Sequence, residues 1–326
     1  MSNENIPTLF EMLGGIETKG IDKLSYQADV YEAIPRFVWK TQTREYGKYL
    51  PILKRDFQHK GVDYQLELIP ARIGDKEYYP GAKEELIEME LVKMAFEKGV
   101  PTFNGTYGIK FSLYEIRQRL SFKGHSYNIP KIKEALHIMS RCTLKVNLLS
   151  KGTKAFLEEP MISGLGMRTW DDWKELGKSS ECFLKFNSLH VESLRRKTWR
   201  LYDLDKALSL TKSLPRWIYK RICRDWIRAK FNYEIKWKLS SIVRDYGMEY
   251  SSIRKARQSV EEALQELTKN RIFMNWEVFD EEKSGVRGTK ISDVTYILKA
   301  DISFISSMKR FNQLSNEAEP LMIPES

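Results

Sequence analysis

The side chains best suited to chemistry in this sequence lie in the segment 251–268. Its apolar residues recur at helical spacing and leave Arg254, Lys255 and Gln258 on the opposite face, within the first two turns. Arginine can donate two hydrogen bonds to guanine, and glutamine can pair with adenine. These residues are typical of a helix that reads bases in the DNA major groove. A capped structural helix would show the same periodicity, so its context must separate the two interpretations.

Other side chains near this helix are suited to phosphates. Arg257 flanks the core face, and Ser251 and Ser252 stand at the helix N-terminus, where hydroxyls and free N–H groups suit an anion. A helix expected over 214–230 carries a basic stripe: Lys220, Arg221, Arg224 and Arg228. A loop expected over 280–290 adds Lys283, Arg287 and Lys290. Each set is also compatible with an ordinary solvated surface.

A second group of candidates lies in the first half of the chain. A helix expected over 128–140 carries four residues outside its core face: Lys131, Lys133, His137 and Arg141. The turn 150–154 adds Lys151 and Lys154. Ile138 also points away from the core face, so this helix is expected to be partly covered by protein. We therefore expect a smaller contribution to DNA binding from this half.

Two stretches with the same element order would position these candidates. The first has a helix over 113–120 capped by Ser112, a helix capped by Asn128, a strand over 142–149 and a second strand from 155. The second has a strand over 233–239, a helix over 241–246 capped by Ser240, a turn at Gly247, the helix over 251–268, and strands over 272–279 and 291–298. Helix, helix, strand, turn, strand is the order of a winged helix.

We therefore expect an α+β fold with two tandem winged-helix domains, an N-terminal arm and a hairpin. Residues 1–80 are expected to form the arm, mobile over 1–30, and a β-hairpin that turns at Gly61. Residues 81–181 form the first winged helix, residues 182–310 the second, and residues 311–326 an acidic, disordered tail. A length of 326 residues suits two such domains.

The net charge of +10 is concentrated in the second half of the chain. Residues 1–180 carry +3, residues 181–310 carry 27 basic and 17 acidic residues, giving +10, and the tail carries −3. A basic domain joined to a nearly neutral one indicates a polyanionic partner, most often nucleic acid. The alternative is a solvated basic surface.

Signatures of enzymes and cofactor sites are missing from the sequence. It has no P-loop, no HxH or HExxH pair and no GxSxG motif, so we expect no cofactor and no metal. The cysteines Cys142, Cys182 and Cys223 are too sparse for a disulfide framework. Two carboxylate pairs, Asp171 with Asp172 and Asp203 with Asp205, leave open a nuclease or primase that uses Mg²⁺. No run of about 18 apolar residues and no signal pattern is present, so we expect a cytoplasmic protein with no membrane partner.

The arrangement resembles plasmid-type replication initiator (Rep) proteins, including those of secondary bacterial chromosomes. The segments 107–146 (YGIKFSLYEIRQRLSFKGHSYNIPKIKEALHIMSRCTLKV) and 214–300 carry the resemblance in element order and hydrophobic pattern. It implies a bacterial, non-catalytic protein that binds repeated double-stranded origin sites, promotes opening of the origin and recruits the host initiator and replicative helicase. It also implies that the second winged helix supplies most specific contacts, while the first adds dimerisation. A transcriptional repressor of the same architecture and a protein that binds acidic partners remain alternatives.

Overall fold

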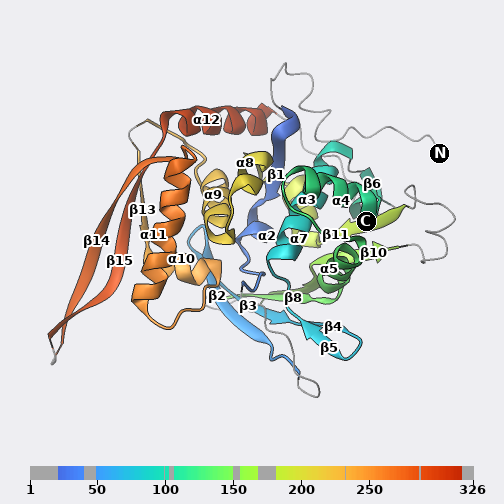
Figure 1. The fold of residues 1–326 in the computed structure, drawn as a ribbon, viewed down its shortest axis with the longest axis horizontal. Helices are drawn as coiled ribbons and strands as arrows, with labels where there is room; N and C mark the ends of the chain where they lie inside the picture. The colour runs from blue at the N-terminus through green and yellow to red at the C-terminus, as the bar shows by residue number, and fades with distance from the viewer. Residues whose placement is uncertain are drawn as a thin grey trace.

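The computed structural model describes residues 21–39, 49–98, 100–102, 106–149, 155–167, 181–231, 233–285 and 288–317. It is a mixed structure of helices and several small antiparallel sheets (Figure 1). Residues 234–300 lie at one end of the view and the helices and strands of 82–166 at the other, and the blue segment 24–33 runs between them. None of the helices in the described part of the chain is long and apolar enough to cross a membrane.

The N-terminal segment is part of the core. After the 3-10 helix η1 (Ile21–Lys23), strand β1 (Leu24–Ala28) pairs with β12 (Trp199–Asp203), and helix α2 (Asp29–Ala33) follows. Tyr26 and Tyr31 are fully buried. The expectation of a mobile arm is therefore wrong for residues 24–30, because a strand buried on both faces depends on partners distant in sequence.

The N-terminal hairpin forms as expected. Strands β2 (Leu53–His59) and β3 (Val62–Ile69) are joined at Lys60 and Gly61, which both have positive φ. This hairpin belongs to a four-stranded sheet of order β2-β3-β8-β9, so it shares its sheet with strands expected in the first winged helix. A second, short hairpin follows, formed by β4 (Ala71–Ile73) and β5 (Lys76–Tyr78).

The first block, residues 113–160, has the expected order of helices and strands. Ser112 Oγ accepts a hydrogen bond from the N–H of Glu115, and Asn128 Oδ1 from that of Lys131, so both predicted caps are confirmed. The elements from here to β10 are α3 (Ala82–Lys98), β6 (Val100–Thr102), β7 (Thr106–Phe111), α4 (Leu113–Phe122), α5 (Ile129–Arg141), β8 (Thr143–Leu148), β9 (Phe156–Pro160) and β10 (Ile162–Gly166).

The elements between the blocks are β11 (Cys182–Phe186), α7 (Ser188–Arg195), β12, α8 (Leu204–Ser209) and α9 (Ser213–Asp225). Strand β11 lies between β10 and β7 in a sheet of order β10-β11-β7-β6. Helix α9 ends at Asp225, five residues before the expected end, so Arg228 lies in a turn beyond it.

The second block, residues 234–300, comprises β13 (Glu234–Lys238), α10 (Leu239–Tyr246), α11 (Ile253–Lys269), β14 (Phe273–Gly285) and β15 (Gly288–Ala300). Helix α10 begins at Leu239, and Ser240 is not its cap: the Ser240 N–H donates to Asp293 of β15 instead. Gly247 ends α10 in the left-handed conformation, as a glycine at this position can without strain.

Two expectations for the end of the chain are wrong. The loop expected over 280–290 is absent, because β14 and β15 remain paired to Gly285 and Gly288. Residues 311–317 are helical, as the last turns of α12 (Ile302–Glu317), which buries Phe311 and Leu314. The remainder of the expected tail, 318–326, lies outside the described residues.

A buried histidine beneath the N-terminal segment gives the fold a pH dependence. His190 Nε2 lies 2.7 Å from the Tyr26 hydroxyl, and burial lowers the pKa of His190 to about 3. Its unfolded pKa is about 6.5, so the unfolded chain binds the extra proton between these values. The free energy of unfolding should therefore fall as pH drops from about 6.5 toward 3, by up to ~1.4 kcal/mol per pH unit.

Urea unfolding at pH 7, 6 and 5 checks this expectation. His190→Gln should flatten the decline of the unfolding free energy between pH 6.5 and 4.5. His125→Gln is the control, because His125 is only partly buried. An unchanged decline in His190→Gln would show that another group is responsible.

Candidate nucleic-acid interface

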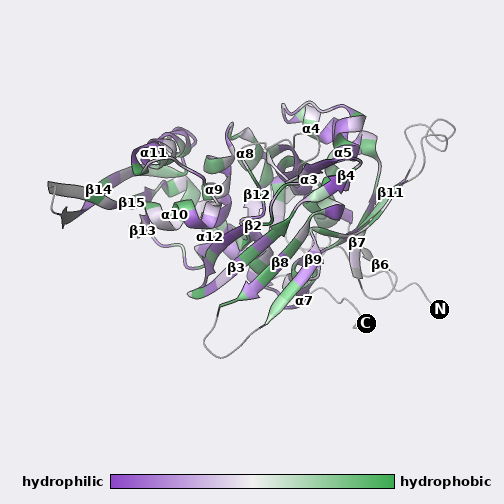
Figure 2. Ribbon diagram, turned by 90° about the horizontal axis from the view of Figure 1, so that it is seen from below, coloured by the Kyte–Doolittle hydropathy of each residue, from purple (hydrophilic) through white to green (hydrophobic). Residues whose placement is uncertain are grey.

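Helix α11 presents the predicted base-reading residues to solvent. Arg254, Lys255 and Gln258 are exposed, whereas Ala256 and Val260 are fully buried. Figure 2 shows largely hydrophilic residues along this helix. Ser252 caps the helix by accepting from the Lys255 N–H, and Ser251 beside it is exposed. The predicted face therefore exists and lies at the surface.

A groove runs between α11 and the hairpin of β14 and β15. Its lining includes three of the predicted residues, Arg254, Arg257 and Gln258, together with Ile291 and Val294 of β15. The structure thus brings the base-reading candidates alongside the expected wing.

Arg257 has a different setting from the other candidates. Its Nε lies 2.7 Å from Glu261 and its Nη1 2.8 Å from Asp280 of β14. These hydrogen bonds, that to Glu261 foremost, raise the pKa of Arg257. Because two carboxylates already neutralise the guanidinium, Arg257 ties α11 to the hairpin and is less available to a phosphate than the sequence suggested.

The hairpin carries Lys299 near its base, where it pairs with Glu277, and two lysines towards its distal end. Lys283 and Lys290 are directly opposite each other near the distal end, next to the pairs that end at Gly285 and Gly288. Arg287 lies outside the described residues. Nearer the base the hairpin is acidic, and Glu281 is held by Lys238 at 2.8 Å. The lysines predicted to contact phosphates thus lie at the distal end of the backbone pairing.

The basic stripe expected on α9 is not at the surface. Arg224 is 6% exposed and makes two hydrogen bonds to Asp225. The Arg221 guanidinium lies 2.9 Å from Asp245, between the rings of Trp217 and Trp237.

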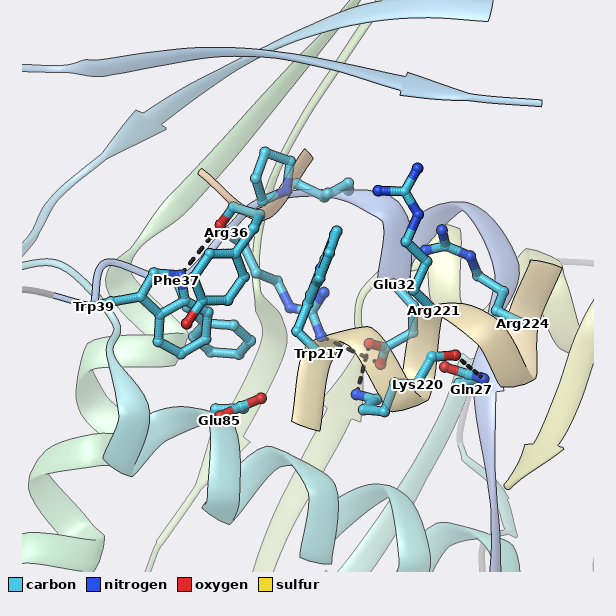
Figure 3. Close-up of a pocket in the computed structure, with 13 residues that line it drawn as sticks. Gln27, Glu32, Arg36, Phe37, Trp39, Glu85, Trp217, Lys220, Arg221 and Arg224 are labelled. Carbon is cyan, nitrogen blue, oxygen red and sulfur yellow. Dashed lines mark hydrogen bonds and ion pairs between the residues drawn. The ribbon is translucent and has the colours of Figure 1, made fainter. Parts of the chain in front are cut away.

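Lys220, from the same stripe, pairs with Glu32 of the N-terminal segment at 2.8 Å (Figure 3). The polar side of α9 is thus held by Glu32 and Asp245 from other elements and by its own Asp225, which disfavours the phosphate role predicted for Arg221 and Arg224. Arg228 is exposed, but in the turn after α9.

The first-block candidates are split between surface and interior. Lys131 and Arg141 are exposed, and Lys133 and His137 are half-buried. Burial, together with Arg141 and Lys133, lowers the pKa of His137, so this ring adds no positive charge near neutral pH.

The predicted covering of α5 by protein is observed. Ile138 is 2% exposed and lies in a cavity lined by Val38, Trp39, Tyr78 and Tyr79. Lys151 and Lys154 lie outside the described residues. Of the basic residues predicted on α5, only Lys131 and Arg141 are therefore exposed.

The carboxylates considered for an enzyme have structural partners where they are described. Asp203 caps α8 by accepting from the Lys206 N–H, and Asp205 lies 3.6 Å from Lys123. Asp171 and Asp172 lie outside the described residues. Within the described ranges, no group of three His, Cys, Asp or Glu side chains is arranged to hold a metal ion.

Sequence reasoning missed a second groove, on the other side of α11. Lys255, Ser259 and Glu262 line it from the helix, and Trp39 and Arg55 line it from the N-terminal half. The spacing of three and four residues on α11 was visible in the sequence. The opposite wall was not, because no local pattern links residues 39 and 55 to α11.

Comparisons with known proteins give structural matches only. No protein-family model matches the chain, and no curated protein matches it. Among solved structures, two structures of domains 2 and 3 of RctB match at 13% identity. The first match covers 84% of this chain and 97% of the RctB chain, with a TM-score of 0.49. The second covers 80% of this chain and 95% of the RctB chain, with a TM-score of 0.46.

A structure of the Pi initiator protein in complex with iteron DNA also matches at 13% identity, covering 68% of this chain and 91% of its own, with a TM-score of 0.44. Pi is named as an initiator protein, the kind of protein that the sequence resembles. At this identity and these TM-scores, the matches assign no function to any residue of this chain.

Proposed function

We propose that this chain is a replication initiator of a plasmid or secondary replicon that binds repeated double-stranded origin sites. The observation that carries the proposal is the exposed set Arg254, Lys255 and Gln258 on α11, next to the hairpin of β14 and β15. The order of α10, α11 and the hairpin supports the interpretation of this block as a winged helix with α11 as its recognition helix.

The dimensions and charges of this block suit duplex DNA. Seventeen residues make α11 roughly 25 Å long. Its N-terminal half would enter the major groove, and the acidic residues Glu261, Glu262 and Glu266 would lie where the helix leaves it. The hairpin strands of thirteen residues span roughly 40 Å, so the distal Lys283 and Lys290 can reach phosphates beside the groove.

The first block is proposed to be a second winged helix with a smaller role. Lys131 and Arg141 are exposed on α5 and can contact phosphates. The partial covering of α5 at Ile138 supports a role in assembly, such as a homodimer, plus partial DNA contact. Opening of the origin and recruitment of the host initiator and helicase complete the proposed activity.

Salt dependence tests the phosphate contacts. The affinity for a duplex selected from a random-sequence library should fall steeply with salt, and each phosphate contact adds about 0.9 to the slope of log K against log salt. Lys283→Ala and Lys290→Ala should each lower the slope by about 0.9, whereas Lys76→Ala, an exposed change on β5, should not. Unchanged slopes in both hairpin variants would remove the hairpin from the interface.

Replication tests the proposed function itself. A plasmid that carries this gene with its flanking DNA should replicate in a suitable host. Repression of the promoter without replication would identify a transcriptional repressor. Nicks or primers formed on the same DNA with nucleotides and Mg²⁺ would identify a nuclease or primase and contradict the proposal.

A further inference from the structure

We propose that Trp39, Arg55 and Gln58 brace the turn between α10 and α11, and so fix the direction in which α11 faces DNA relative to the first block. We call these three residues, with Asp245 and Tyr246 at the end of α10 and Gly247 of the turn, the brace. The inference rests on the proposed function and assigns a positioning role to a part of the chain for which the sequence indicated none.

Trp39 makes the first contact of the brace. Its ring stacks on that of Tyr246, with the ring centres 4.7 Å apart and the planes 9° from parallel. Its Nε1–H donates to the Tyr246 carbonyl oxygen at 3.1 Å. One side chain therefore fixes both the backbone and the ring of the last residue of α10.

Arg55 of β2 makes the second contact, at Gly247. A Cβ atom on Gly247 would lie 2.8 Å from the Arg55 guanidinium, so only glycine allows this approach. Arg55 Nη1 donates to the carbonyl oxygens of Pro35 and Phe37, at 2.7 and 2.6 Å. The guanidinium is thus held by the N-terminal segment while it packs against the turn.

Asp245 makes the third contact and connects three elements. Its carboxylate accepts from the backbone N–H of Gln58 in β2 at 3.2 Å and from Arg244 Nε at 2.7 Å. It also lies 2.9 Å from Arg221 of α9. Asp245 is 4% exposed, so its charge depends on these partners.

The brace should act as a rigid unit. Moving the first block away from α10 would remove the Gln58 N–H from the buried Asp245 carboxylate, and a buried charge that loses a partner is unfavourable. The adjacent Glu32–Lys220 and Glu85–Arg216 pairs join α2 and α3 to α9, and their four side chains are at most 9% exposed. We therefore expect the distance between α11 and the first block, and the orientation of one relative to the other, to be fixed.

A fixed geometry predicts sensitivity to the spacing within the DNA site. Five base pairs are half a helical turn, so inserting them moves one contact region to the opposite side of the duplex. The wild-type protein should bind the extended site roughly tenfold or more weakly than the original. Footprinting locates the bases that α11 reads: the wild-type protein protects them, and Arg254→Ala does not.

The test compares three variants on the original site, the extended site and the α11 region alone. In Trp39→Ala and in Asp245→Asn, the ratio of the affinities for the original and extended sites should fall to under about threefold. The affinity of both variants for the α11 region alone should be unchanged. Trp39→Phe keeps a stacking ring, so it should retain most of the wild-type preference for the original site over the extended site. Phe231→Ala is the control, because this half-exposed aromatic lies outside the brace.

The outcomes separate the brace from the proposed function. Unchanged spacing discrimination in both Trp39→Ala and Asp245→Asn would overturn the brace, as would a wild-type protein that binds both spacings equally. If Trp39→Ala does not fold, Asp245→Asn decides. Failure of the wild-type protein to prefer any duplex would overturn the proposed function instead.

Discussion

Replacing Arg254 with alanine is expected to weaken binding to the cognate duplex by ~1–3 kcal/mol, and to relax specificity at one base pair. Arg254 is exposed on α11, and none of the described residues forms an ion pair with its guanidinium. It is thus available for the two hydrogen bonds that guanine accepts. Titration of a selected duplex and of its single-base variants, by fluorescence anisotropy, measures both effects.

Two further variants control this result. Lys269→Ala removes a positive charge from the exposed C-terminal end of α11 and should change affinity little. Arg254→Lys keeps the charge but not the paired donors, so it should retain salt dependence and lose base discrimination. If Arg254→Ala and Lys255→Ala both leave binding unchanged, α11 is not the recognition helix.

The largest effect on stability is expected from Glu85→Ala. Glu85 Oε2 lies 2.6 Å from Arg216 Nη1, and both side chains are at most 5% exposed. Burial raises the pKa of Glu85 despite this partner, which indicates that the intact pair adds little net stability. Removing only the carboxylate, however, leaves the Arg216 charge buried and unpaired, at a cost of about 3–5 kcal/mol in the free energy of unfolding.

Urea unfolding of three variants checks this interpretation. Glu85→Met combined with Arg216→Met should recover most of the loss, because apolar residues of similar volume can replace a buried pair. Glu261→Ala, which removes a partly exposed partner of Arg257, should cost less than about 1 kcal/mol. A similarly small loss in Glu85→Ala would contradict the buried-pair account.

The features that the sequence predicted correctly are local ones. The caps Ser112 and Asn128, the hairpin turn at Gly61 and the left-handed Gly247 depend on a few neighbouring residues. The exposed face of α11 follows from helical periodicity alone. Such signals need no knowledge of the rest of the chain.

The features that the sequence did not predict depend on distant partners. Strand β1 pairs with β12, which lies well over 100 residues away in the sequence, and no local sequence pattern predicts that pairing. The periodicity of α9 separates a polar side from an apolar one, but does not show whether the polar side faces water. Glu32 and Asp245 come from other elements and turn that side into an interior layer of ion pairs.

Two local signals were present but misread. The polar residues and glycines of 280–290 suggested a loop. A hairpin exposed to water, however, tolerates charged residues in its strands when opposite charges pair between the strands. Lys299 and Glu277 of this hairpin pair in this way. The apolar residues Phe304, Met308 and Phe311 continue at helical spacing, which indicated α12. We expected disorder in this region because acidic residues follow.

The most direct test of the account is the ratio of affinities of the full-length protein for a duplex selected from a random library and for the same duplex with its sequence scrambled. At physiological salt, a sequence-specific reader should bind the selected duplex ~10³-fold or more tightly, and Arg254→Ala should reduce that ratio. A ratio near one would mean that the basic face binds polyanions without reading sequence, and would contradict the assignment of α11.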